Sequence, residues 1–128
     1  MSQNAEIRAH APDGTWFAQR DGPDGCAPVV VLAHGVGLDL DMWDAQAAVL
    51  ARDYTVLRYD MLGHGKTAPL SRRSELSDYC DQLLALLDFL GHSRVVLVGF
   101  SMGGVITERF AADHGGRLHG IALMSNFD

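Results

Sequence analysis

VVLVGFSMGG, residues 95–104, is the most informative segment of the chain, because an apolar run ends there in a G-x-S-x-G pattern centred on Ser101. A buried strand that passes straight into a helix through one serine forces that serine into a strained turn, with its hydroxyl lifted clear of the sheet. Gly99 and Gly103 lack Cβ atoms, so the strand can turn sharply and the helix can approach closely. The pattern predicts Ser101 as a nucleophile, although a chain with 14 glycines can also contain it by chance.

The strands predicted around this motif are short, apolar and unbroken rather than alternating. They cover residues 29–33, 54–59, 95–98 and 121–124. Such runs are typical of strands buried on both faces of a parallel sheet. Upstream, residues 5–10 and 15–20 flank Pro12-Asp13-Gly14, which predicts an antiparallel hairpin.

Helical patterns separate these strands. The first covers about residues 41–51 and has Asp39 or Asp41 as its cap, and the second is capped by Ser74 and closed by Gly91. The third begins at the serine and ends at His114, before two glycines. Alternating strands and helices predict one α/β domain over residues 1–128, with a mainly parallel sheet of about four strands. Functional groups gather at the carboxyl ends of the strands in such sheets.

Composition excludes several functional classes. The 128 residues are 48% hydrophobic and 20% charged, as in a globular protein, and the net charge of −6 argues against nucleic-acid and anionic-membrane partners. No apolar stretch is long enough to span a membrane and no signal-peptide pattern opens the chain, so we expect a cytoplasmic protein. Cys26 and Cys80 are expected to be reduced thiols. Neither metal-binding motifs nor a nucleotide-binding G-x-G-x-x-G occurs, so we expect no metal and no cofactor.

A glycine-rich turn, His34-Gly35-Val36-Gly37, follows the first buried strand. An acyl-transfer serine needs two N–H donors aimed at the developing oxyanion, and the residue after the nucleophile, Met102, supplies one. The N–H of Val36 is the natural second donor, because Gly35 and Gly37 allow the backbone to turn inward. The alternative is that His34 to Gly37 form a plain strand-to-helix turn.

A second turn, Asp60 to Thr67, follows the next strand at the same edge of the predicted sheet. Gly63 and Gly65 permit a tight turn there. We expect Asp60 to bind backbone N–H groups of the turn, and His64 to be a loop residue rather than a catalytic base.

The hairpin, the two glycine-rich turns and the G-x-S-x-G motif follow one another along the chain as in an α/β-hydrolase. The chain therefore resembles the N-terminal half of a protein of that family. LAHGVGLDLDMWDAQ, VLRYDMLGHG and VVLVGFSMGG are similar to the 3-oxoadipate enol-lactonase branch and related small carboxylic-ester hydrolases. The chain departs from that branch at Leu62, where an arginine is usual, and at Thr67, where a serine is common. The resemblance implies the α/β-hydrolase fold and hydrolysis of a small ester, lactone or thioester. A serine at the motif excludes relatives that use an aspartate nucleophile.

The rest of a catalytic triad is missing from the predicted arrangement. The family order is Ser, then acid, then His. His114 lies about 20 Å along the third helix from Ser101, and only His34 and His64 are placed at the active edge. Three further histidines are predicted away from this edge, namely His10, His92 and His119. Asp128 follows the last strand at the functional edge and is a candidate acid.

We therefore expect a truncated fold, with later strands, the cap, the acid and the histidine beyond residue 128 and no activity in this chain alone. The last strand would then be an apolar, unpaired edge, which predicts marginal stability or self-association through it. The alternative function is a non-catalytic α/β domain that binds ligands or partners, with a relic motif at Ser101.

Overall fold

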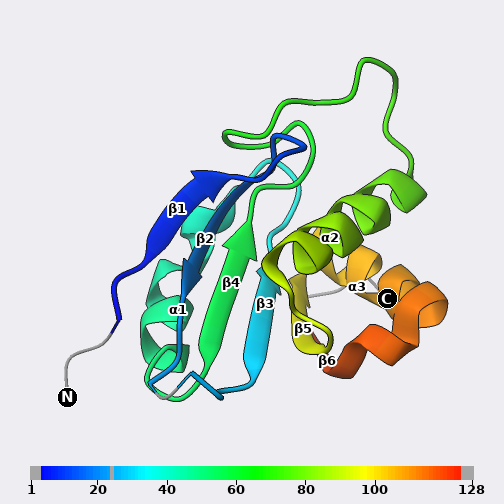
Figure 1. The fold of residues 1–128 in the computed structure, drawn as a ribbon. Coiled ribbons are helices and arrows are strands. Elements are labelled where there is room, and N and C mark those ends of the chain that lie inside the picture. Colours follow the sequence, from blue (N-terminus) through cyan, green and yellow to red (C-terminus); the bar gives the residue numbers. More distant parts are fainter. Residues whose placement is uncertain (1–3, 24, 125–128) are drawn as a thin grey trace.

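The sheet has six strands in the order β1-β2-β4-β3-β5-β6 in the computed structural model, which describes residues 4–23 and 25–124 (Figure 1). The strands are β1 (Ile7–His10), β2 (Trp16–Arg20), β3 (Val29–Ala33), β4 (Thr55–Tyr59), β5 (Val95–Phe100) and β6 (Leu118–Met124). Four of them, β4, β3, β5 and β6, run parallel, while β1 and β2 form an antiparallel hairpin against β4. The predicted fold class, hairpin and parallel strands are confirmed.

Helices cover both faces of the sheet (Figure 1). The 3₁₀ turn η1 (Leu40–Trp43) and α1 (Asp44–Leu50) pack on one face, against alternate residues of β3 and β4. On the other face lie α2 (Leu76–Leu90) and α3 (Met102–His114), the latter followed by the 3₁₀ turn η2 (Gly115–Arg117). Among the described residues, no helix is long and apolar enough to cross a membrane.

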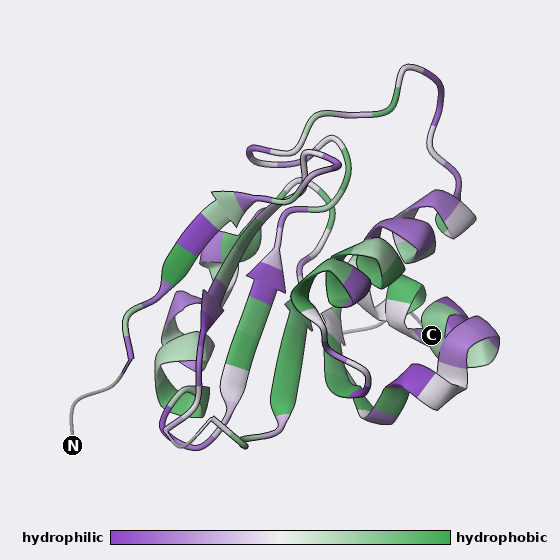
Figure 2. Cartoon of the chain, viewed as in Figure 1, coloured by the Kyte–Doolittle hydropathy of each residue, from purple (hydrophilic) through white to green (hydrophobic). Residues whose placement is uncertain are grey.

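Burial differs between the central strands and the edge. All of β4 and most of β3 is buried, as the apolar runs predict, and Figure 2 shows these strands largely in the hydrophobic colour. The same prediction is wrong for β6, where Ile121, Leu123 and Met124 are each more than two-fifths exposed. The reason is position, because within residues 4–23 and 25–124 β6 pairs only with β5 and has no strand on its other side. The predicted apolar edge is therefore present among the described strands.

The start of β6 and the cap of α2 differ from the sequence prediction. β6 begins at Leu118, three residues earlier than expected, so His119 lies within the strand rather than before it. The cap of α2 is Glu75 rather than Ser74, because the Asp78 carboxylate accepts a 2.8 Å hydrogen bond from the Glu75 N–H. The predicted caps Asp39, before η1, and Gly91, with φ of 78° after α2, are both found.

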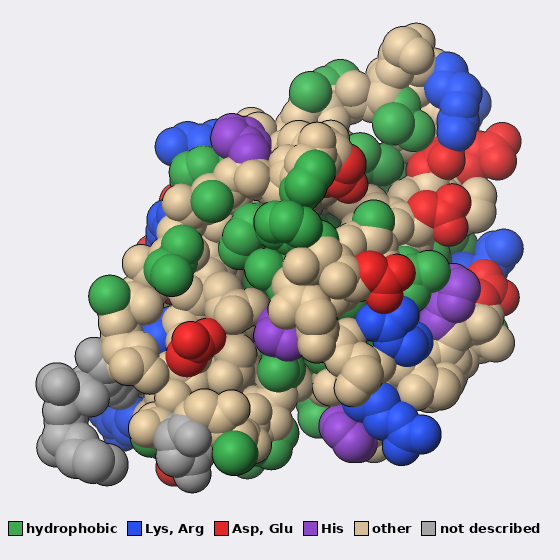
Figure 3. Space-filling model, viewed as in Figure 1, with side chains coloured by type: hydrophobic (Ala, Val, Ile, Leu, Met, Phe, Trp, Pro, Cys, Tyr) green, Lys and Arg blue, Asp and Glu red, His purple; other side chains and the backbone are tan. Residues whose placement is uncertain are grey.

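Charged side chains of both signs are interspersed over the face seen in Figure 3. Near the hairpin, the buried Arg58 guanidinium pairs with Glu6 at 3.0 Å and with Asp44, which ties β4 to the N-terminal segment and to α1. This ion-pair group anchors the hairpin side of the sheet, away from the turn at Ser101.

Candidate active site

Ser101 occupies the turn between β5 and α3 in a conformation that a side chain rarely adopts. Its φ of 55° and ψ of −114° make it the only residue other than glycine with a positive φ in the described ranges 4–23 and 25–124. Backbone of this kind costs about 1–3 kcal/mol and persists where the surroundings enforce it. Here the Ser101 N–H donates to the Met124 carbonyl at 3.2 Å, and the Gly104 N–H donates to the Ser101 carbonyl at 2.9 Å. The strained turn that the sequence predicts is therefore present.

The two glycines of the motif sit where backbone approaches too closely for a Cβ atom. A Cβ at Gly99 would overlap the carbonyl of Gly103, and one at Gly103 would overlap the carbonyls of Ala33 and His34. Contact of this kind brings the start of α3 against the loop that follows β3. The turn at Ser101 and the His34 to Gly37 loop are thus held together, as neighbouring strands β3 and β5 require.

The loop after β3 has the conformation expected of a glycine-rich turn. Gly37 has a φ of 76°, and a Cβ on Gly35 would meet the ring of Phe100 at 2.9 Å. The Val36 side chain is 66% exposed. The N–H groups of Val36 and Met102 donate no hydrogen bond to the residues that the structure describes. Both N–H groups are therefore available to a ligand oxygen, which is the chemistry of an oxyanion hole.

His34 is completely buried and uses both ring nitrogens. Its Nε2 accepts a hydrogen bond from the Met61 N–H at 3.0 Å, and its Nδ1 lies 2.8 Å from the Gly35 carbonyl oxygen. Burial lowers the pKa of His34 below its ordinary value of 6.5, so the ring is neutral near pH 7. With both nitrogens engaged, His34 cannot take a proton from Ser101. The hydrogen bond from Met61 could not be predicted from the sequence, because Met61 is remote from His34 along the chain.

The second turn is organised by Asp60, as expected. Its carboxylate accepts hydrogen bonds from the N–H groups of Leu40 and Lys66, each at 2.8 Å. Gly65, with φ of 52°, lies against that carboxylate. His64 is half-buried, with its Nδ1 2.9 Å from the Leu62 carbonyl oxygen and its ring centroid 5.1 Å from that of His34. Asp60 is structural, and the bond to Leu40 links this turn to the one after β3.

No histidine hydrogen-bonds to Ser101 among the described residues, which include all six histidines of the chain. His92 and His119 lie at the opposite edge of the sheet, and His114 ends the 13-residue helix α3. His10 corrects the sequence prediction, because the antiparallel hairpin returns it to the same edge as Ser101. It is nevertheless four strands away, roughly 19 Å. Asp128, the candidate acid, lies outside the described residues.

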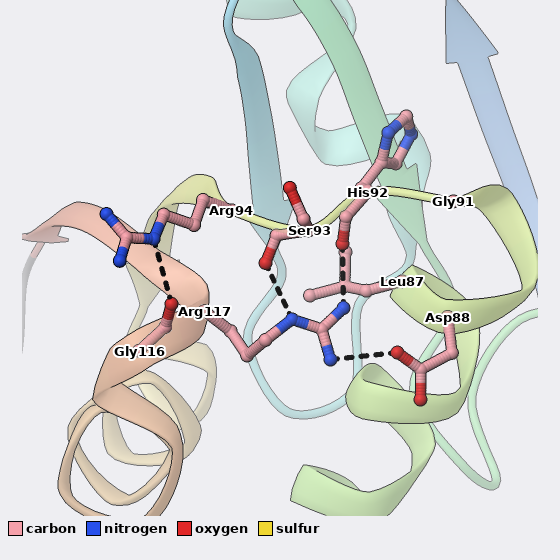
Figure 4. Close-up of a pocket in the computed structure, with 8 residues that line it drawn as sticks. All are labelled: Leu87, Asp88, Gly91, His92, Ser93, Arg94, Gly116 and Arg117. Carbon is pink, nitrogen blue, oxygen red and sulfur yellow. Dashed lines mark hydrogen bonds and ion pairs between the residues drawn. The ribbon is translucent and has the colours of Figure 1, made fainter.

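A cavity of about 420 Å³ lies at the other edge of the sheet, between the end of α2 and η2 (Figure 4). Arg117 donates to the carbonyls of His92 and Ser93, at 2.7 and 2.6 Å, and pairs with Asp88 at 2.8 Å. Arg94 donates to the Gly116 carbonyl at 3.1 Å. These bonds join α2 to η2, so the charged groups serve the fold. Nowhere in the described part of the chain do three or more His, Cys, Asp or Glu side chains form a group that could hold a metal ion.

Comparisons with known proteins agree with the fold. Residues 28–128 match the family model described as alpha/beta hydrolase fold. A curated relative, the dihydrolipoyllysine-residue acetyltransferase component of the acetoin cleaving system of Pseudomonas putida, is 34% identical over 87% of this chain and 29% of its own length. The crystal structure of the enol-lactonase from Burkholderia xenovorans has a TM-score of 0.83 and 34% identity over 94% of this chain and 46% of its own.

Naproxen esterase from Bacillus subtilis is a further solved relative, with a TM-score of 0.83 and 27% identity over 95% of this chain and 43% of its own. The chain therefore spans less than half the length of each of these three proteins. Their similarity supports the fold.

Proposed function

This chain belongs to the α/β-hydrolase family, and on that premise we propose that it supplies the nucleophile and the oxyanion hole of a serine hydrolase of carboxylic esters, lactones or thioesters. The observation that carries the proposal is the strained backbone of Ser101 at the end of β5. The turn presents a serine hydroxyl at the edge of the sheet where the Val36 and Met102 N–H groups have no hydrogen-bond partner among the described residues. That combination is what acyl transfer requires.

The proposed reaction begins with attack of the Ser101 oxygen on the carbonyl carbon. The hydroxyl proton passes to a general base, and the carbonyl electron pair moves onto oxygen to form an oxyanion. Hydrogen bonds from the N–H groups of Val36 and Met102 stabilise that oxyanion, and loss of one such donor typically slows the reaction by about 10²- to 10³-fold. The oxyanion then collapses, the alcohol or thiol leaves with a proton, and water hydrolyses the acyl-enzyme. We assign no residue of the chain as the general base.

The substrate class follows from the nucleophile and from the relatives. Two of the similar proteins are named as an enol-lactonase and an esterase, whose substrates share a carbonyl carbon bonded to an oxygen leaving group. A serine nucleophile attacks such carbonyls to give an acyl-enzyme. A hydrolase of an activated carboxylic acid derivative is therefore the function that the site supports best.

A fluorophosphonate probe tests the proposal directly. The Ser101 oxygen bonds to phosphorus, fluoride leaves, and the hydroxyl proton is released, so mass spectrometry locates the label. Labelling needs a general base, so the probe is applied to a form of the protein that includes one; we expect labelling at Ser101, none in Ser101→Ala, and unchanged labelling in Ser93→Ala, which removes an exposed serine at the opposite edge of the sheet. If that complete, folded form remains unlabelled at Ser101, the result contradicts the proposal and favours the non-catalytic domain.

A further inference from the structure

Strand pairing ties the loop after β3 to the nucleophile strand only at the base of the loop. β3 pairs with β5 as far as Ala33 and Gly99. Within the described parts of the chain, residues 35–38 form no hydrogen bond to β5 or to the turn at Ser101. The distance between the Val36 N–H and the Ser101 hydroxyl therefore depends on how the loop packs against β5.

The loop is held together by its own hydrogen bonds. The Leu38 N–H donates to the Gly35 carbonyl at 3.2 Å, and Nδ1 of His34 lies 2.8 Å from the same oxygen. These bonds fix the peptide groups of the loop relative to one another, so the loop moves as one unit. They do not fix its distance from the strand that leads to Ser101.

Phe100 is the side chain of β5 that touches this loop. It is the last residue of the strand, directly before Ser101, and a Cβ atom on Gly35 would lie 2.9 Å from Cδ2 and 3.1 Å from Cε2 of its ring. The φ of Gly35 is not positive, so this contact, rather than the backbone conformation, leaves no room for a side chain. Phe100 packs in turn against the core cluster between α1 and the sheet, which includes Leu32 and Trp43. Gly35 therefore rests on a ring that the core supports.

We propose that Phe100 is a positioning residue whose ring sets the distance between the Val36 N–H and an oxyanion formed at Ser101. The inference rests on the proposed function, since it gives Val36 the role of donor. Phe100 lies one residue before the nucleophile and Gly35 one residue before the donor, so the ring between them couples the positions of these two groups. A misplacement of about 1 Å in a reacting site can cost about 10²-fold in rate.

Two substitutions change this contact from opposite sides. Phe100→Leu removes the ring edge and lets the loop approach β5, whereas Gly35→Ala adds a Cβ atom against the ring and pushes the loop away. In the double variant the added methyl group occupies part of the space that the ring has left. Val98→Ala is the matched control, because Val98 lies on the same face of β5 and packs against the same core cluster, but about 7 Å further from the loop along the strand.

The second-order rate constant for fluorophosphonate labelling of Ser101 measures the effect, in a form of the protein that includes the general base. We expect Phe100→Leu and Gly35→Ala each to label about tenfold to a hundredfold more slowly than the unsubstituted protein, and Val98→Ala to label within a few-fold of it. The double variant should label faster than Gly35→Ala alone, because the ring that the methyl group would overlap is gone. Thermal unfolding of each variant shows whether it is folded and how much stability it has lost.

A second probe separates the oxyanion contact from a general loss of packing. Sulfur in place of the phosphoryl oxygen of the probe is a weaker hydrogen-bond acceptor. The ratio of the labelling rates of the oxygen and sulfur probes therefore reports on the hydrogen bonds that the oxyanion hole donates. We expect Phe100→Leu to lower this ratio several-fold and Val98→Ala to leave it unchanged. A purely structural role for Phe100 would slow both probes equally.

The failure of the positioning role can be told apart from the failure of the proposed function. If Phe100→Leu leaves the ratio unchanged, or if the two substitutions act independently in the double variant, the positioning role is overturned and the proposed function is left intact. If the unsubstituted protein is folded, includes the base and remains unlabelled at Ser101, the proposed function is overturned and the positioning role with it. A lowered ratio in Phe100→Leu, together with faster labelling of the double variant than of Gly35→Ala, supports the assignment.

Discussion

Exchange of Ser101 for glycine and for alanine tests the backbone strain, since the two variants differ only in a Cβ atom. Both remove the hydroxyl. At an ordinary helix position glycine is less stable than alanine by about 0.5–1 kcal/mol, because the unfolded chain gains freedom. At Ser101, with φ of 55°, glycine instead removes the strain of a Cβ atom in a forbidden region.

The magnitude follows from these two opposing terms. Relief of strain contributes about 1–3 kcal/mol in favour of glycine, and the entropy of the unfolded chain offsets about 0.4–1 kcal/mol of it. We expect Ser101→Gly to be more stable than Ser101→Ala by about 1–2 kcal/mol. For a chain of this length that difference corresponds to roughly 3–6 °C in the unfolding midpoint.

Urea unfolding followed by tryptophan fluorescence measures this difference, with Trp43 buried in the core as reporter. The matched control is Ala112→Gly, at an exposed position of α3, where the same chemical change should be destabilising by about 1 kcal/mol. Opposite signs at the two positions are the expected result. If the alanine variant of Ser101 is instead more stable than the glycine variant by about 1 kcal/mol, as expected at position 112, the serine carries no strain and the reasoning is refuted.

Three further predictions concern packing, protonation and association. Gly103→Ala forces a Cβ into the backbone of the loop after β3 and should cost about 1–3 kcal/mol in urea unfolding, whereas Gly116→Ala, which meets nothing within 4 Å, should be neutral; equal effects would contradict the packing. Burial lowers the pKa of His34 and of His92 from 6.5, so the unfolded chain binds more protons near and below that pH, and the free energy of unfolding should fall as the pH is lowered through about 6.5. His34→Asn should flatten that fall, and an unchanged slope would show that His34 does not contribute. The exposed edge β6 should cause self-association in sedimentation, which Leu123→Lys should reduce; a monodisperse monomer with cooperative melting contradicts this.

The sequence was sufficient for those features that depend on neighbours along the chain. Unbroken apolar runs located β3 without error and β4 to within one residue, and the turn at Gly14 located the hairpin. The strain at Ser101 was also predictable, because a strand and a helix joined by one residue leave that residue little conformational choice. These features depend on residues close together in the chain, so the hydrophobic periodicity and the turn residues are enough to predict them.

Features that depend on contacts between residues distant in the chain could not be predicted from local sequence patterns. His34 meets Met61 only because β3 and β4 are neighbours whose following turns lie at one edge of the sheet. β6 starts early because pairing with β5 extends it through His119 and Gly120, residues with weak strand preference. His10 returns to the edge of the candidate site through the reversal of the hairpin. In each case tertiary pairing, rather than local preference, determines the outcome.

Stability alone does not account for a serine at position 101. Its backbone has a φ at which glycine would be free of strain, and its hydroxyl forms no hydrogen bond to the described residues that would offset about 1–3 kcal/mol. The neighbouring glycines, by contrast, are explained by packing, because a Cβ at Gly99 or Gly103 has no room. Replacing Ser101 would stabilise the fold, whereas replacing the glycines beside it would destabilise the fold. This combination is expected where a scaffold holds a functional group in place. The same reasoning separates the two candidate functions, because a binding domain without chemistry has no use for the hydroxyl, whereas acyl transfer requires it.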